Sequence, residues 1–554
     1  MHTLRDSIVV RDVRLVDTDG DAGGGADVAR HATVDVVIAG ERVARVEPPG
    51  TTAGADVGRV VDGDGRLVLP GFVDAHSHAD GRIFNPEVQL ALLRQGVTTI
   101  IGGQDGVSYA PGDGGYAREY FAAINGSHPR YADGGIAALL AGYDGTTPLN
   151  AATLVPAGTV RYEVCGRSTD AATPAQLAAM QQLVADGLAA GAVGLSTGLD
   201  YVPGIFAGTG ELALLTEPVA AARAVHVSHL RGGYEANSAA GVTELAEIAR
   251  RSGAAVHVSH FHAEPAIVHE LMSELAATGV DATFDAYPYT RGCSILAMPI
   301  LPPALSVRPT SEVLTVLADP VERERLLVEW FPTIVDYPSL GPHWPAMMTL
   351  AHVAAPEYDW AHGLTLEDAA RRAGTDPANL ALDVLAASRL EVNVVMAVQN
   401  ERTASELARI LAHPRAIGGS DGIFVGAHPH PRARGTFARY LRSLVLEHGV
   451  IDWPDAAALV STRAVDRFGL GERGRVRSGA IADLVLVDPA RILDRATYEA
   501  PLLLADGIDD VLVAGVPVLA GGELTGATPR RGIRRSPAPR RPRRERRARR
   551  TEES

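Results

Sequence analysis

Residues 68–78 read Val-Leu-Pro-Gly-Phe-Val-Asp-Ala-His-Ser-His, an apolar run that ends in two histidines. The run predicts a buried β-strand over 68–76, because short apolar segments bounded by turn residues are typical of strands covered on both faces. His76 and His78 are two residues apart, so on an extended chain their side chains point to one face and can bind one metal ion. The segment therefore predicts a metal-binding strand end.

Seven further strands of this kind follow along the chain. The full predicted set is 68–76, 97–104, 135–142, 192–199, 224–229, 255–260, 279–287 and 415–421. Helical stretches lie between most of them, and one helix is marked by Thr173 as N-cap, Pro174 at its first position and Gln176 completing a capping box. Strands alternating with helices predict an α/β fold, a (β/α)8 TIM-like barrel over residues 67–473.

Two additions to the barrel are expected. The long interval before the last strand predicts a helical insertion at about residues 300–390, which on the catalytic face acts as a lid or specificity element. Short strands at the two ends, within 1–66 and 474–528, predict a small β-sandwich domain built from both chain ends, with one hairpin turning at Ala514-Gly515.

An arginine-rich tail occupies residues 529–554, with twelve arginines and three glutamates from position 530 onward. Its few apolar side chains cannot form a core, so we expect it to be disordered. It is either a solvated extension or an arm for nucleic acid or another acidic partner. We favour the first and expect at most nonspecific nucleic-acid contact, because no folded nucleic-acid module precedes it.

Composition excludes several mechanisms. The chain has 554 residues, and all 51 of its lysine and arginine residues are arginine. The absence of lysine excludes a P-loop, Schiff-base chemistry and a metal site bridged by a carbamylated lysine. Two cysteines, Cys165 and Cys293, indicate a reducing compartment. With no secretion-signal pattern and no apolar run of about 18 residues, we expect a cytoplasmic protein without a membrane partner.

Candidate metal ligands occupy the carboxyl ends of five predicted strands, where barrel enzymes carry their catalytic groups. They are His76, His78, Asp105, His229, His260 and Asp421. Imidazole-rich sites favour zinc, so we expect one or two divalent cations, with Asp105 placed to bridge two. Such a cation lowers the pKa of water to about 7 and polarises a carbonyl, which indicates hydrolysis. Asp421 can accept the water proton and return it to the leaving nitrogen.

Three other histidines follow the same strands. His226 and His257 each precede a better-placed candidate metal ligand, His229 or His260, by three residues. We therefore interpret both as hydrogen-bonded core residues. His262 lies two residues after His260 and therefore shares its face, which leaves a site role open.

Several segments resemble the amidohydrolase superfamily, and in particular its N-acyl-D-amino-acid deacylase (D-aminoacylase) branch. They are Pro70–His78, Gly194-Leu-Ser-Thr-Gly-Leu-Asp-Tyr201, Asp285-Ala-Tyr-Pro-Tyr289, Gly419-Ser-Asp-Gly422, His428-Pro-His-Pro-Arg432, Gly435-Thr-Phe437 and Arg477–Leu486. The resemblance spans about residues 6–528. It implies that Asp421 is the catalytic aspartate, that Arg432 binds the substrate carboxylate bidentately, and that Tyr287 helps to polarise the scissile carbonyl.

The chain departs from this family pattern at three positions, and the role of a fourth residue, Arg291, is open. Asp105 stands where many relatives have cysteine, which replaces a bridging thiolate by a harder ligand. His262 stands where relatives commonly have lysine, and Ala157 where many have histidine. Arg291, after the Tyr-Pro-Tyr segment, is either an extra substrate-binding cation or a surface arginine.

We therefore predict a metal-dependent amidohydrolase that cleaves small-molecule N-acyl-D-amino acids to a carboxylate and a free D-amino acid. The D configuration comes from the resemblance alone. One alternative is a cyclic-amide hydrolase such as a hydantoinase or dihydroorotase, which typically uses the carbamylated lysine that this chain cannot form. Another is a non-catalytic barrel scaffold, which predicts missing ligands. Side-chain preference, acyl preference, the number of metals and the oligomeric state are open.

Overall fold

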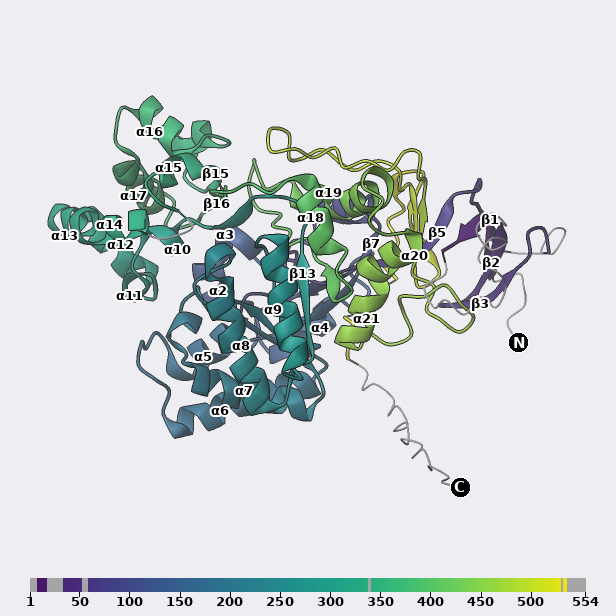
Figure 1. The fold of residues 1–554 in the computed structure, drawn as a ribbon, viewed down its shortest axis with the longest axis horizontal. Helices are drawn as coiled ribbons and strands as arrows, with labels where there is room; N and C mark the ends of the chain where they lie inside the picture. Colours follow the sequence, from purple (N-terminus) through teal and green to yellow (C-terminus); the bar gives the residue numbers. More distant parts are fainter. Residues whose placement is uncertain (1–6, 17–32, 52–57, 337–339, 530–531, 536–554) are drawn as a thin grey trace, which may run out of the picture.

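Strands from the two ends of the chain form one sheet. The computed structural model describes residues 7–16, 33–51, 58–336, 340–529 and 532–535 (Figure 1). In spatial order the sheet contains β21 (Glu523–Leu524), β20 (Val516–Ala520), β19 (Asp510–Val513), β18 (Leu484–Val487), β5 (Leu67–Pro70), β1 (Ser7–Leu15), β2 (Val34–Ala39) and β3 (Arg42–Glu47), and β4 (Arg59–Asp62) pairs with β1. The expected sheet from both ends is confirmed, as is the hairpin turn at Ala514-Gly515, where both residues have positive φ. Its sandwich arrangement and the domain boundaries stay predictions.

Two parallel sheets form the centre of the molecule. One is ordered β17 (Ala416–Gly418), β13 (Ala282–Ala286), β12 (Ala255–Val258), β11 (Val225–His229), β10 (Gly194–Gly198) and β9 (Val155–Pro156), and the other β6 (Phe72–Asp74), β7 (Val97–Gly102) and β8 (Asn150–Thr153). Backbone hydrogen bonds join them on both sides, from Ala75 N to Gly418 O at 3.0 Å and from Val193 N to Thr153 O at 2.9 Å. Parallel strands have their carboxyl ends at the same edge, which brings the candidate ligands together.

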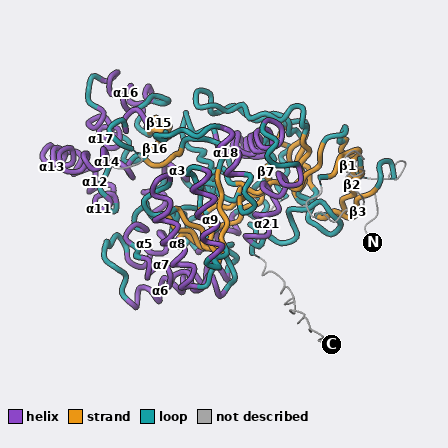
Figure 2. The backbone as a smooth tube through the Cα atoms, viewed as in Figure 1, coloured by secondary structure: helices purple, strands orange, loops and turns teal. Residues whose placement is uncertain are grey.

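Helices surround these strands (Figure 2). They are α1 (Pro86–Leu93), α2 (Gly115–Tyr120), α3 (Ala122–Asn125), α4 (Gly135–Gly142), α5 (Ala157–Cys165), α6 (Pro174–Ala189), α7 (Thr209–Ala221), α8 (Ser238–Ser252), α9 (Pro265–Ala277), α18 (Ala404–Leu411), α19 (Arg432–Arg439), α20 (Trp453–Ala457) and α21 (Arg463–Phe468), with short 3-10 or π segments η2 (Gly204–Phe206), η3 (Glu235–Asn237), η6 (Tyr440–Glu447) and η7 (Ala458–Thr462). The Thr173–Gln176 capping box of α6 is confirmed. The α/β class is therefore confirmed.

Among the described residues, no helix is both long and apolar enough to cross a bilayer.

One predicted strand, 135–142, is wrong: these residues form helix α4. Ile136, Leu139 and Leu140 are buried on one face at helical spacing. A short apolar run does not by itself distinguish a strand from a buried helix, which explains the error. The third strand of the central sheets is instead β8. It begins with Asn150 and ends with Thr153, so it lacks the apolar run from which a buried strand is predicted.

The insertion is larger than predicted and contains a sheet. Strands β14 (Gly292–Ile295), β16 (Val392–Met396) and β15 (Met348–Val353) pair antiparallel in that order. The helical segments are α10 (Ala297–Ile300), α11 (Pro303–Ser306), α12 (Thr310–Ala318), α13 (Pro320–Arg325), η4 (Leu326–Trp330), α14 (Phe331–Asp336), α15 (Trp344–Met347), η5 (Pro356–Ala361), α16 (Leu366–Ala373) and α17 (Pro377–Ala387). Its apolar side chains form a core of their own, and it projects to one side of the molecule in Figure 1.

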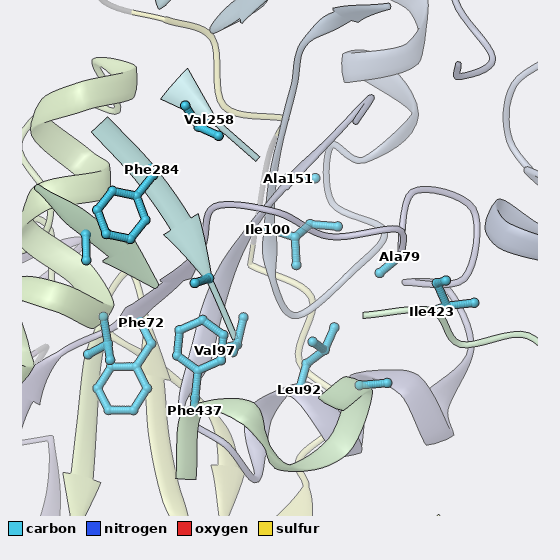
Figure 3. Packing of buried hydrophobic residues seen from close by; sticks show 14 of the residues in the cluster. Phe72, Ala79, Leu92, Val97, Ile100, Ala151, Val258, Phe284, Ile423 and Phe437 are labelled. Carbon is cyan, nitrogen blue, oxygen red and sulfur yellow. The ribbon is translucent and has the colours of Figure 1, made fainter. Parts of the chain in front are cut away.

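The central core extends onto the terminal sheet. Phe72 of β6 stacks on Phe437 of α19 with ring centroids 6.1 Å apart, and Leu92 and Val97 belong to the same buried cluster (Figure 3). This packing joins β6 to α19 across the centre, and Leu69 of β5 and Val485 of β18 in the same cluster extend it onto the terminal sheet. The metal-ligand strands are therefore held on a rigid base.

The end of the chain contributes to a second core cluster. Ile533 is 6% exposed and packs with Val73, Ile101 and Val225. Its amide donates to Ala151 O at 2.7 Å, and the Arg535 amide donates to Gly191 O at 3.0 Å. The expectation of a disordered tail from residue 529 is therefore wrong for residues 532–535. Residues 530–531 and 536–554 lie outside the described part of the chain.

Candidate metal centre

The six predicted ligands converge at the carboxyl ends of β6, β7, β11, β12 and β17, and all six are buried. Their donor atoms form two groups. The first contains His76, His78, Asp105 and Asp421, and the second contains Asp105, His229 and His260; within each group the donor atoms lie within 4.8 Å of one another. Asp105 is common to both groups, so its carboxylate is placed to bridge two ions.

Distances around Asp105 describe this shared position. Oδ2 lies 3.6 Å from His78 Nε2, and Oδ1 lies 3.6 Å from His76 Nε2. Oδ1 also lies 3.7 Å from His260 Nε2 and 4.0 Å from His229 Nδ1. These separations are too long for hydrogen bonds but suit ligands arranged around a cation.

Three of these ligands have unusual backbone conformations. Asp105, His260 and Asp421 have φ values of 54°, 33° and 50°, in the left-handed region that non-glycine residues seldom occupy. Each follows the end of a strand, where the turn directs its side chain toward the other ligands. Such conformations cost about 1–3 kcal/mol each and cluster at functional sites.

Unsatisfied polar atoms test whether a metal fits. His76 Nε2 and Asp105 Oδ1 are buried without a hydrogen-bond partner among the described residues. A buried polar atom of this kind costs stability unless a ligand or ion satisfies it. Imidazole nitrogens with carboxylate oxygens are the donor set of zinc, so the residues fit one or two such ions.

A second layer of residues orients the histidines. His76 Nδ1 lies 3.3 Å from Asp285 Oδ2, His78 Nδ1 lies 3.0 Å from Asn125 Oδ1, and His229 Nε2 lies 3.2 Å from Asp200 Oδ2. A metal-binding histidine typically donates its other N–H to such an oxygen, which leaves one nitrogen free for the metal. Our sequence reasoning assigned none of these three a role, although Asp285 and Asp200 lie in the quoted family segments.

The carboxylates raise the pKa of two histidines. Burial lowers the pKa of His76, but Asp285, Asp105 and Asp421 outweigh burial and raise it to about 9. Burial also lowers the pKa of His78, but the nearby carboxylates of Asp105 and Asp421 outweigh burial and raise it to about 10. The site therefore favours positive charge, which protons or metal ions can supply.

Asp421 connects the metal ligands to a buried arginine. Its Oδ1 lies 3.3 Å from His78 Nε2, and its Oδ2 lies 2.8 Å from Arg432 Nη2. Burial raises the pKa of Asp421, but Arg432, His78 and His76 outweigh it and hold the pKa below its usual value. Asp421 is therefore ionised at neutral pH and able to accept a proton.

Arg432 is fully buried, and its guanidinium lies 4.5 Å from the ring centroid of Tyr287. Its contact with Asp421 is an ion pair rather than an aligned hydrogen bond, because none of its three guanidinium nitrogens has a hydrogen-bond partner among the described residues. A guanidinium with unused donors can bind a carboxylate.

The remaining predicted substrate residues differ in position. A cavity of about 620 Å³ opens onto the ligands, and Tyr287 and His262 line it. Neither Arg432 nor Arg291 is among its lining residues. Arg432 contacts the lining residues Asp421 and Tyr287. The Arg291 guanidinium instead lies 3.4 Å from Glu401 and 4.4 Å from the Tyr498 ring centroid. The surface interpretation of Arg291 therefore fits its surroundings better.

His262 is held in one tautomer by an arginine that sequence reasoning missed. Arg402 Nη2 lies 3.3 Å from His262 Nδ1. Because arginine only donates, Nδ1 must accept, and the ring proton is then on Nε2, which has no partner among the described residues.

The prediction that His226 and His257 are hydrogen-bonded core residues is confirmed. They are bonded to Thr197 and Asp285 respectively.

A buried group of histidines and aspartates of this kind is typical of metal-dependent hydrolases. The amidohydrolase family model matches residues 59–301 and 342–519. The chain belongs to the amidohydrolase family.

Known proteins resemble it over most of its length. An N-acyl-D-glutamate deacylase of Alcaligenes xylosoxydans xylosoxydans is 33% identical over 87% of this chain and 89% of that protein. A D-aminoacylase of the same organism is 29% identical over 91% and 94%. The crystal structure of an N-acyl-D-glutamate deacylase from Bordetella bronchiseptica, complexed with zinc and a phosphonate inhibitor that mimics the tetrahedral intermediate, has a TM-score of 0.77 and 27% identity over 95% of this chain and 99% of that one.

Proposed function

We propose that this protein is a metal-dependent amidohydrolase that hydrolyses N-acyl-D-amino acids to a carboxylate and a free D-amino acid. The observation that carries the proposal is the pair of ligand groups that share Asp105 and adjoin the Asp421–Arg432 ion pair. The deacylase relatives support the linear amide substrate and its D configuration.

The six ligands would hold one or two ions, with zinc as the first choice. When bound, the metal supplies Lewis-acid polarisation of the scissile carbonyl and lowers the pKa of water. Asp421 accepts the proton of the attacking water and delivers it to the leaving nitrogen. Its lowered pKa keeps it in the ionised form that this first transfer requires.

Arg432, Tyr287 and His262 position the substrate. The unused donors of Arg432 bind the α-carboxylate, which places the amide beside Asp421. Burial raises the pKa of Tyr287, so its hydroxyl stays protonated and can donate to the carbonyl oxygen as charge develops there. His262 offers a further donor through Nε2. We assign Arg291 no role in catalysis.

We also propose that the two parallel sheets close as an eight-stranded barrel, in which β8 and β9, separated only by Leu154, count as one strand, with the insertion as its lid. The backbone hydrogen bonds at both seams support closure. The absence of lysine argues against a cyclic-amide hydrolase with a carbamylated lysine, and the assembly of all six ligands argues against a scaffold that has lost activity.

A screen of paired N-acetyl-D- and N-acetyl-L-amino acids with zinc-loaded protein tests the proposal. We expect the D-isomers to be hydrolysed at the amide and the L-isomers to be poor substrates, with ninhydrin detection of the released amine. Protein stripped with a chelator is the control and should regain activity with zinc. Equal activity without metal, or a preference for L-isomers, would contradict the proposal.

A further inference from the structure

The cavity above the metal ligands is larger than an N-acetyl-amino acid needs. Its volume of about 620 Å³ lies in the range of pockets that bury drug-sized ligands. With the carboxylate at Arg432 and the amide at the metal ligands, two parts of the substrate remain free to fill it: the amino-acid side chain and the acyl group.

The arginines that line this cavity are already neutralised. Among its lining residues in the described chain these are Arg231 and Arg402. Arg231 Nε lies 3.0 Å from Glu244 Oε2, and Arg402 Nη1 lies 2.6 Å from Glu235 Oε2. The Arg402 side chain is only 4% exposed, so breaking its ion pair to bind another carboxylate would leave Glu235 without its partner.

Acidic side chains make the cavity unfavourable for a second substrate carboxylate. Asp200 and Glu235 line it in addition to the metal ligands Asp105 and Asp421. Asp200 already accepts from the Gly232 amide at 2.7 Å and contacts His229. A glutamate or aspartate side chain of the substrate would lose its hydration and gain no unpaired cation.

Apolar residues of the insertion also line the cavity. They are Met298, Pro299, Pro303, Trp330, Ile334, Leu340. Ile124 and Ile205 add apolar surface from the central part of the fold. Trp330 adds a large apolar ring to this wall, and its buried Nε1, which has no hydrogen-bond partner among the described residues, can donate to an uncharged acceptor of the substrate.

We propose that the preferred substrates are N-acyl-D-amino acids in which both the side chain and the acyl group are uncharged and apolar. The specificity is therefore opposite to that in the name of the N-acyl-D-glutamate deacylase that this chain resembles. This inference rests on the proposed deacylase function.

Matched substrates separate charge from size. For zinc-loaded protein we expect kcat/KM for N-acetyl-D-leucine, D-methionine and D-phenylalanine to exceed that for N-acetyl-D-glutamate by at least about 100-fold, the scale set by unpaired buried polar groups and lost apolar contacts. N-acetyl-D-glutamine is the neutral isostere, and its kcat/KM should exceed that of N-acetyl-D-glutamate by about tenfold or more.

The acyl group is tested separately. With D-methionine as the amino acid, lengthening the acyl group from acetyl to butanoyl or hexanoyl should raise kcat/KM. Preference for D-glutamate, or a loss on lengthening the acyl chain, would overturn the inference while leaving the deacylase function intact. No hydrolysis of any D-derivative would instead remove the proposed function.

A single substitution tests the charge argument. Thr333 lines the cavity from α14 and is exposed, so Thr333→Arg adds an unpaired cation at little cost to the fold. We expect it to raise the D-glutamate to D-glutamine ratio of kcat/KM by about tenfold. Val335→Arg is the matched control, because Val335 is 38% exposed on the same helix and does not line the cavity. An unchanged ratio in Thr333→Arg would show that charge in the cavity does not set the preference.

Discussion

Arg432 Nη2 lies 2.8 Å from Asp421 Oδ2, and both side chains are buried. The pair joins the residue that we propose to bind the substrate carboxylate to the residue that we propose to transfer the proton. Each stabilises the charge of the other. The proposed binding of the α-carboxylate at Arg432 would therefore place it next to the proposed catalytic base.

Asp421→Asn should lower kcat by about 100- to 10,000-fold, the contribution expected of a general base. Zinc should remain in the group formed by Asp105, His229 and His260, to which Asp421 does not belong. Turnover and metal content by mass spectrometry check both parts. Asp466→Asn, at a surface ion pair with Arg475, is the control. Near-normal turnover would remove Asp421 from its proposed role.

Arg432→Gln should destabilise metal-free protein by about 3–5 kcal/mol, because it removes the guanidinium partner of Asp421 Oδ2 and leaves the buried carboxylate with only His78 and His76 beside Oδ1. The same substitution in an Asp421→Asn background should cost less than half as much. Denaturant unfolding of the four proteins in this cycle measures the coupling. Equal costs in the two backgrounds would mean that the ion pair does not contribute.

Asp200→Asn should weaken zinc binding by about 10- to 100-fold at the His229–His260 group, because Asp200 orients His229 through Nε2. Competition with a fluorescent zinc chelator measures the affinity. The group that contains His76 and His78 should keep its affinity. A uniform loss at both groups would indicate general unfolding instead of lost orientation.

Zinc affinity should rise with pH from about 6 to 9. The pKa values of about 9 for His76 and about 10 for His78 mean that both imidazoles are protonated in metal-free protein at neutral pH. Because these pKa values lie above the pH, zinc must displace protons, and affinity gains up to about tenfold per pH unit for each proton released. Calorimetry in buffers of different ionisation enthalpy counts the protons, and a pH-independent affinity would contradict the expectation.

Ile533 should matter for stability although it lies in the arginine-rich tail. Ile533→Ala should lower the free energy of unfolding by about 2–5 kcal/mol, the usual cost of truncating a buried isoleucine. Ending the chain at Pro529 should cost at least as much. Ending it at Arg535 keeps the contacts of residues 532–535 and should change stability by less than about 0.5 kcal/mol. Equal stability of the Pro529 and Arg535 truncations would contradict this role.

Much of the fold could be predicted because its signals are local. The capping box of α6 and the Ala514-Gly515 turn each depend on a few adjacent residues. The extended conformation of the run before His76 could also be predicted, but as one strand over 68–76, whereas the structure divides it into β5 of the terminal sheet and β6 of the centre. Helix α4 and the sheet of the insertion could not be predicted in this way. A short apolar run fits either a helix or a strand until its neighbours select one.

The sequence alone determined which residue types stand at the ends of the strands, and hence a metal-binding hydrolase site without lysine. The sharing of Asp105 by two ligand groups, the neutralisation of Arg402 by Glu235 and the place of Ile533 in the core became visible in the folded chain. Strand geometry follows from neighbouring residues, whereas ion pairs, hydrogen bonds and packing join residues that are far apart in the chain. Their partners are selected by the topology, which no local pattern records.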